Sequence, residues 1–114
     1  MTTPALHQIK TEFDSVQPFL LAVGDEKRQA IIIALLHDTS GHGLRVGDLT
    51  ATTRLSRPAV SHHLKLLKEA GIVAIRAEGT KNYYVLANIQ PALQNLRSLA
   101  DDMLTFLSTK ENAQ

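Results

Sequence analysis

Apolar residues recur every three or four positions near both ends of the chain, which is the spacing of one face of an α-helix. A first helix is predicted over residues 6–23, with Pro18 inside it as the expected point of a kink or a break. A last helix is predicted over residues 89–108, and the polar tail 109–114 is expected to fray. Both helices carry one apolar stripe each.

The segment between these helices begins with a capped, strongly apolar helix. Asp25 can accept hydrogen bonds from the free N–H groups at a helix start, and the run from Ala30 to Leu36 is apolar almost throughout. We therefore expect the helix of residues 26–37 to be the buried centre of the fold. Residues 38–43 are rich in turn formers and predict a loop.

The next part of the chain predicts two short helices and a β-hairpin. Ser56 is a strong capping residue, and Gly71 is typical of the position just past a helix end. The two helices span residues 46–70, and two β-rich runs around a turn at 78–81 make up residues 72–87. This order predicts a winged helix-turn-helix: a single, mainly α domain over residues 1–114 with a small β-hairpin as its wing.

The second of these short helices has an apolar side and a polar, cationic side. In such a fold this helix lies in the major groove of DNA with its N-terminal residues nearest the bases. Arg57, Ser61 and His62 suit base edges, whereas Lys65 and Lys68 suit phosphates. The residues predicted to contact DNA are Arg54, Ser56, Arg57, Pro58, Ser61, His62, Lys65, Lys68, Arg76 and Lys81.

The charge of the chain is concentrated where this surface is predicted. The formal net charge is only +1, but residues 45–81 contain seven basic and three acidic side chains and the rest contains five basic and eight acidic. A basic middle between acidic ends is what a local polyanion-binding surface needs.

Several classes of function are excluded or disfavoured by what the chain lacks. It has no cysteine, which excludes disulfides, thiolate metal sites and cysteine nucleophiles and agrees with a reducing cytoplasm. It shows no signal peptide and no apolar run near the ~20 residues that span a bilayer. We find no catalytic constellation and predict a cytoplasmic protein that is not an enzyme and needs no cofactor.

Histidines leave one alternative for a metal ion. His37, Asp38 and His42 could bind zinc or nickel, although unpaired histidines at a helix end and in a loop are usually solvated. His63 lies nearer the predicted core and is expected to be packed and hydrogen-bonded. No metal site is therefore predicted.

Three segments resemble the ArsR/SmtB-type family. Residues 61–73, Ser-His-His-Leu-Lys-Leu-Leu-Lys-Glu-Ala-Gly-Ile-Val, are similar to its recognition helix and first wing strand. Gly79 and the sequence Tyr-Tyr-Val-Leu at 83–86 resemble its wing, and residues 22–31 resemble its "L-x-D-x-x-R-x-x-I-L" helix. The resemblance covers residues 19–88 and implies a homodimeric transcriptional repressor that releases its operator when an inducer binds.

The chain departs from this family pattern in two ways. Family members commonly have a glycine in the turn before the recognition helix, where this chain has Thr-Arg-Leu-Ser at 53–56, and the loop after Leu36 is long. The family's metal sites use cysteines at the start of the helix-turn-helix, or histidines and carboxylates on the last helix. The chain has no cysteine and no histidine from Ile89 onward, so neither type of metal sensing is expected and the inducer stays unidentified.

The first and last helices present more apolar surface than a small core can cover. Pairing them across a two-fold axis would bury it and place two recognition helices about one DNA turn (~34 Å) apart on a palindromic operator of double-stranded DNA. A winged-helix module that binds another protein is the alternative function. The predicted dimer interface consists of Ile9, Phe13, Val16, Phe19, Leu93, Leu96, Ala100, Met103 and Leu107.

Overall fold

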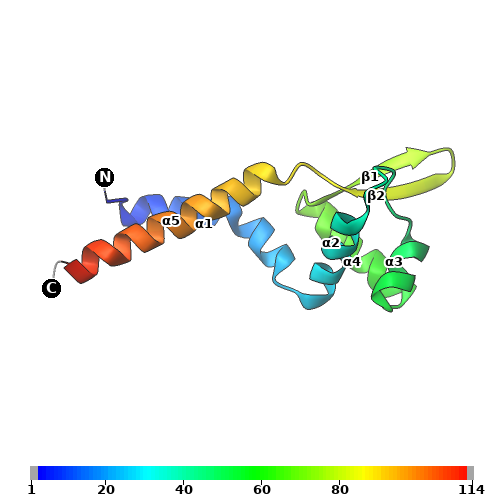
Figure 1. Ribbon diagram of the computed structural model, residues 1–114, viewed down its shortest axis with the longest axis horizontal. Coiled ribbons are helices and arrows are strands. Elements are labelled where there is room, and N and C mark those ends of the chain that lie inside the picture. Colours follow the sequence, from blue (N-terminus) through cyan, green and yellow to red (C-terminus); the bar gives the residue numbers. More distant parts are fainter. Residues whose placement is uncertain (1–2, 113–114) are drawn as a thin grey trace. The chain divides into compact units, whose positions relative to one another are not determined.

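The computed structural model describes residues 3–112, and their contacts divide the chain into two compact units. One unit combines the residues up to Pro18 with those from Gln90 onward, and the other is Phe19–Ile89. Helix α1 (Leu6–Val23) continues through Pro18 and contributes to both units (Figure 1). The predicted alternative of a break at Pro18 is therefore wrong, since a proline removes one hydrogen bond without preventing the helix from resuming.

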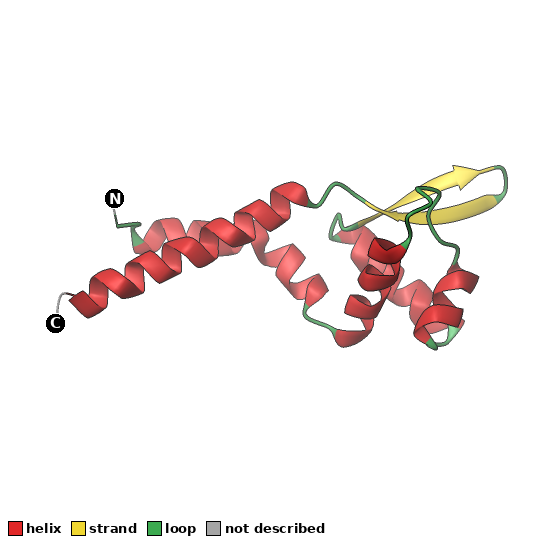
Figure 2. Cartoon of the chain, in the orientation of Figure 1, coloured by secondary structure: helices red, strands yellow, loops and turns green. Residues whose placement is uncertain are grey.

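The second unit contains three further helices and a hairpin. Its elements are α2 (Glu26–His37), α3 (Val46–Thr53), α4 (Arg57–Glu69), β1 (Val73–Glu78) and β2 (Lys81–Leu86). Helices α2, α3 and α4 pack on one another, and the antiparallel strands extend from them as a two-stranded sheet (Figure 2). The predicted winged helix-turn-helix architecture is confirmed.

The hairpin is tighter than the sequence indicated. Glu78 pairs with Lys81, so only Gly79 and Thr80 form the turn, and Gly79 has the positive φ of 62° that such turns favour. In the middle of the hairpin, where Tyr84 pairs with Ile75, the Leu44 N–H donates to the Tyr84 carbonyl at 2.9 Å and the Tyr84 N–H donates to the Leu44 carbonyl at 2.7 Å. This bridge ties the loop before α3 to the wing.

Glycine is required at the position before that bridge. Gly43 has a φ of 90°, and a Cβ added there would lie 2.6 Å from the Tyr84 carbonyl oxygen. Both the backbone conformation and the close approach therefore exclude a side chain.

Helix α2 is only partly buried. Ile31, Ala34 and Leu35 are buried, but Ile33 and Leu36 are each 63% exposed. The expectation that α2 is the buried centre of the fold therefore holds for one face only, because within this unit α3, α4 and β2 cover only part of the α2 surface.

The first unit pairs the N-terminal part of α1 with α5 (Gln90–Asn112). Gln8 Nε2 donates to Asp102 Oδ2 at 3.4 Å, and the hydroxyls of Thr3 and Thr109 lie 3.3 Å apart. Helix α5 continues past the predicted end at residue 108, so the expected fraying is wrong for 109–112, while 113–114 lie outside the described residues. No helix in the described part of the chain is both long and apolar enough to cross a membrane.

The start of α2 depends on one side chain. Asp25 Oδ1 accepts hydrogen bonds from the backbone N–H groups of Lys27 at 2.9 Å and Arg28 at 3.0 Å, as the sequence predicted. We expect Asp25→Ala to lower the free energy of unfolding by about 1 kcal/mol, because two helix N–H groups lose their acceptor. Thermal melts followed by circular dichroism measure this. Asp25→Asn keeps an acceptor and is the control; an equal loss in both variants would contradict the capping role.

Candidate nucleic-acid interface

Helix α4 separates an inner from an outer face as the sequence predicted. Val60, Leu64 and Leu67 are at most 1% exposed and hold the helix on the core. Ser56 Oγ accepts from the Ala59 N–H at 3.2 Å and sets the helix start, and proline occupies the first turn. The outer face consists of the exposed side chains Arg57, Pro58, Ser61, His62, Lys65 and Lys68.

The turn before α4 is built around a left-handed residue. Arg54 has a φ of 62°, the one positive φ of a non-glycine residue in the part of the chain that is described. Its backbone N–H donates to the Thr50 carbonyl at 2.9 Å and closes α3, while its side chain is exposed. The turn therefore has a helix-terminating conformation usually supplied by glycine, and a cationic side chain projects from it.

Arg76 is held by several contacts, although 37% of its side chain is exposed. Its Nε donates to the His42 carbonyl at 3.0 Å, its Nη1 donates to Glu78 Oε2 at 3.0 Å, and its guanidinium lies 4.8 Å from the centre of the Tyr83 ring. Nη2 is buried. The guanidinium therefore ties the wing to the loop before α3, and the predicted contact of Arg76 with DNA stays a prediction.

Sequence reasoning missed Arg45. A polar groove of about 400 Å³ lies between the start of α3, the start of α4 and the wing tip, and Arg45 and Arg57 both line it. Thr80 and Asn82 of the hairpin line the same groove. Two guanidinium groups beside a helix start and polar side chains suit a phosphate. The signal in the sequence was the position of Arg45, directly before the predicted start of α3.

At the wing tip, Lys81 is exposed and pairs with Glu78 across the strands. The remaining predicted contact, Ser56, is exposed at the start of α4. The predicted DNA contacts of α4 and of the turn before it are thus all exposed, Arg76 is engaged with the loop before α3, and Arg45 is added as a candidate contact.

His63 is half-buried on α4 and hydrogen-bonded, as expected. Arg28 of α2 donates from Nη1 to His63 Nδ1 at 3.3 Å and from Nε to the Ala22 carbonyl at 2.7 Å. Burial lowers the pKa of His63, and the Arg28 cation lowers it further, while Asp25 opposes both. A neutral imidazole therefore links α4 to the start of α2.

Comparison with known proteins identifies the fold. The family model described as "Bacterial regulatory protein, arsR family" matches residues 25–74. The transcriptional repressor SdpR of Bacillus subtilis is 30% identical over 94 residues, which are 80% of this chain and 91% of SdpR. The chain belongs to the ArsR family.

Two further proteins resemble this ArsR-family chain over more than half of its length. The HTH-type transcriptional regulator Rv2034 of Mycobacterium tuberculosis is 45% identical over 65 residues, 57% of this chain and 57% of its own length. The structure of reduced HlyU from Vibrio cholerae has a TM-score of 0.67 at 28% identity and covers 79% of this chain and 90% of that one. The family is one of bacterial regulatory proteins and the matched relatives are named as transcriptional regulators, as the resemblance in the sequence predicted.

The loop predicted as the alternative metal site has another role in this ArsR-family chain. Asp38 accepts hydrogen bonds from Ser40 Oγ at 2.6 Å, from the Ser40 N–H at 3.2 Å and from the Gly43 N–H at 3.1 Å. Within residues 3–112, no three histidine, aspartate or glutamate side chains come together as a metal site. His37, Asp38 and His42 are therefore not assembled into one, because the carboxylate is used to order the loop.

The predicted dimer residues fall into two sets. Ile9, Val16 and Phe19 are already buried in the single chain, and Leu96 is half-buried. The exposed set consists of Phe13, Leu93, Ala100, Met103 and Leu107.

The stability of the fold should decrease in mild acid because of His63. The lowered pKa of His63 means that the folded state disfavours its protonation, so stability is complete above the ordinary value of 6.5 and falls as the pH drops through and below it. We expect the melting temperature of the wild type to fall between pH 7.5 and pH 5.5, and His63→Gln to reduce this fall. His62→Gln, an exposed neighbour, is the control; equal pH dependence in wild type and His63→Gln would refute the assignment.

Proposed function

We propose that the chain is a homodimeric, sequence-specific DNA-binding repressor of transcription that leaves its operator when an effector binds. The observation that carries the proposal is the outer face of α4, where four exposed side chains, Arg57, Ser61, Lys65 and Lys68, follow helical spacing opposite a fully buried face. Membership of a family of regulators, with a repressor matched over most of its length, supports it.

Each group on this face has a distinct role in the proposed complex. Arg57 at the start of α4 can donate two hydrogen bonds to guanine, and Ser61 and His62 can donate to or accept from base edges. Lys65 and Lys68 lie further along the helix and suit phosphates, which set the register of the protein on the duplex.

The flanks of α4 supply further phosphate contacts. Arg54 in the turn and Arg45 in the polar groove are both exposed arginines beside helix ends. Ser56 and Pro58 place the free N–H groups of the first turn near a phosphate. Lys81 serves the same purpose from the wing, whereas Arg76 orients the wing from within.

The proposed dimer uses the apolar residues that the first unit leaves exposed. Leu6 and Phe13 of α1 and Leu93, Met103 and Leu107 of α5 are all between 38% and 65% exposed. Burying such side chains in a two-fold interface is favourable by roughly 25 cal/mol per Å² of apolar surface. A two-fold dimer presents two recognition helices and so matches a palindromic operator.

The proposed effector is not a metal ion held at either of the sites named for the family in the sequence comparison. The chain has no cysteine and α5 has no histidine. On α5, Asp102 accepts from Gln8, and its carboxyl raises the pKa of Glu12 mainly through a hydrogen bond. Carboxyl groups without an imidazole beside them make a poor zinc site.

A winged-helix module that binds another protein is the competing function, and salt separates the two. Binding to DNA through about six phosphates should weaken by about 10³ between 50 and 200 mM salt, because phosphate contacts release counterions. An apolar protein interface has no such dependence.

We expect the double variant Arg57→Glu, Lys65→Glu to lose operator binding by roughly 100-fold or more, since it removes a base contact and a phosphate contact and adds repulsion. The operator is first selected from genomic fragments retained by the wild type, and affinities are then measured by fluorescence anisotropy. Lys10→Glu, Lys110→Glu changes the net charge by the same amount within the first unit and is the control. Unchanged retention by the α4 variant would end the proposal.

The proposed dimer interface can be tested by replacing exposed apolar side chains of α5 with charged ones. We expect Met103→Asp, Leu107→Asp to sediment as a folded monomer and to bind the operator at least ~10-fold more weakly, because charges replace apolar contacts and one half-site is lost. Ser98→Asp lies on another side of α5 and should stay dimeric. A dimer persisting in the double variant would show that this stripe of α5 is not the interface.

A further inference from the structure

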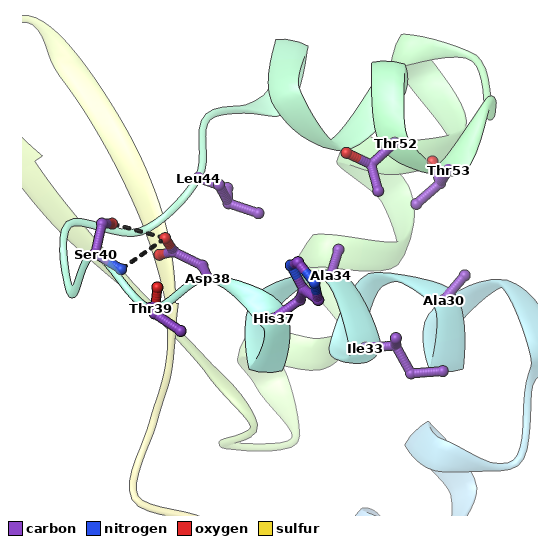
Figure 3. A pocket seen from close by; sticks show the side chains of 10 residues that line it. All are labelled: Ala30, Ile33, Ala34, His37, Asp38, Thr39, Ser40, Leu44, Thr52 and Thr53. Carbon is purple, nitrogen blue, oxygen red and sulfur yellow. Dashed lines mark hydrogen bonds between the residues drawn. The ribbon is translucent and has the colours of Figure 1, made fainter.

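An open groove of about 790 Å³ lies between α2 and α3, on the side of α3 that leads into the turn before α4 (Figure 3). All of its lining residues come from residues 30–53 of the second unit. Ala30, Ile33 and Ala34 line it along α2, and Thr52 and Thr53 line it along α3. Its volume is in the range of small-molecule sites, about 300–1,000 Å³.

The groove leaves a large apolar side chain in water. Ile33 is 63% exposed although it lies in the middle of α2. Leu44 adds apolar surface where the loop closes one end of the groove. Covering such side chains with an apolar molecule is favourable because their surface is removed from water.

Polar groups stand at the loop end. Asp38 is fully engaged, since Ser40 and the Gly43 N–H donate to it. His37 and Thr39 line the same end, and the His37 ring lies beside Ala34 on the groove side of α2. An imidazole can donate or accept one hydrogen bond while neutral. The ordered loop therefore offers a defined polar end to a mainly apolar groove.

We propose that this groove binds a small, neutral, mainly apolar organic molecule whose single polar group forms a hydrogen bond with His37, and that this molecule is the effector. The binding half of this proposal stands on the groove alone, and the regulatory half rests on the proposed operator binding.

The position of the groove can couple ligand binding to DNA binding by α4. Thr52 and Thr53 form the last turn of α3, and Arg54 follows directly in the strained turn that leads to α4. A molecule that contacts both α2 and α3 favours the spacing of these two helices that fits it best. Because α4 is tied to α2 through Arg28 and His63, a shift of α3 alters the angle between the two helices of the helix-turn-helix. A ligand that prefers the shifted state lowers DNA affinity by its difference in affinity for the two states.

Binding is tested with N-phenyl-1-naphthylamine, a neutral apolar dye that fluoresces when it leaves water. We expect saturable binding of one dye per wild-type chain, and binding at least ~10-fold weaker in Ile33→Asp, which places a charge in the groove. Leu36→Asp is the matched control, because Leu36 lies on the same helix with the same 63% exposure and does not line this groove. Thr52→Phe fills the groove from the α3 side and should also weaken binding.

The outcomes separate the site from the function. Equal dye binding in wild type, Ile33→Asp and Thr52→Phe would overturn the site, and so would conversion of the dimer to a monomer by Ile33→Asp, since the groove would then be an interface between copies. In the DNA arm, saturating dye should weaken operator retention by the wild type roughly 5- to 150-fold. Unchanged retention overturns the regulatory role alone. A wild type that retains no DNA overturns the proposed function and leaves the dye result to stand by itself.

Discussion

The burial of one face of α4 is the constraint on which the rest of the second unit depends. Val60, Leu64 and Leu67 are almost completely removed from water, and each such side chain contributes about 1.5–3 kcal/mol when buried. Because a helix has 3.6 residues per turn, fixing this face also fixes which residues lie opposite. The exposed row consists of Arg57, Ser61, Lys65 and Lys68. These side chains face solvent because the opposite face of the helix is buried.

The position of the wing is also set by α4. Gly71 leaves α4 with a φ of 76°, and the Ile72 N–H donates to the Leu67 carbonyl at 2.9 Å, so β1 starts from a defined point. The Leu44 bridge to Tyr84 and the Arg76 bond to His42 then connect the hairpin to the loop before α3. The hairpin is therefore held near its middle by backbone bonds and one guanidinium, and its tip carries exposed polar groups.

The spacing of apolar residues predicted correctly which face of α4 is buried. It did not predict which residues from different elements contact each other. The two sides of α4, the Asp25 cap and the Ser56 start all depend on residues a few positions apart, so they could be inferred from the sequence. The role of Arg76 could not, because its partner carbonyl belongs to a residue 34 positions away.

The exposure of Ile33 escaped prediction for a related reason. An apolar run shows that a helix can be buried all round, but the number of elements that cover it is a property of the fold. Arg45 joined the candidate interface only once the wing tip was seen beside the start of α3.

Arg54 shows why the departure from the family's glycine bears on the proposed function. A residue with a Cβ costs roughly 1–2 kcal/mol in the left-handed conformation that Arg54 adopts, and the closing bond to the Thr50 carbonyl uses only the backbone. Glycine would therefore supply the same turn with less strain. The side chain makes up for this cost only if it does something glycine cannot. In the proposed DNA complex, this exposed guanidinium just before α4 would hold a phosphate, and backbone strain of this size is found where a site needs a particular group. Arg54 thus supplies both the strained backbone of the turn and a positive charge for the proposed DNA interface.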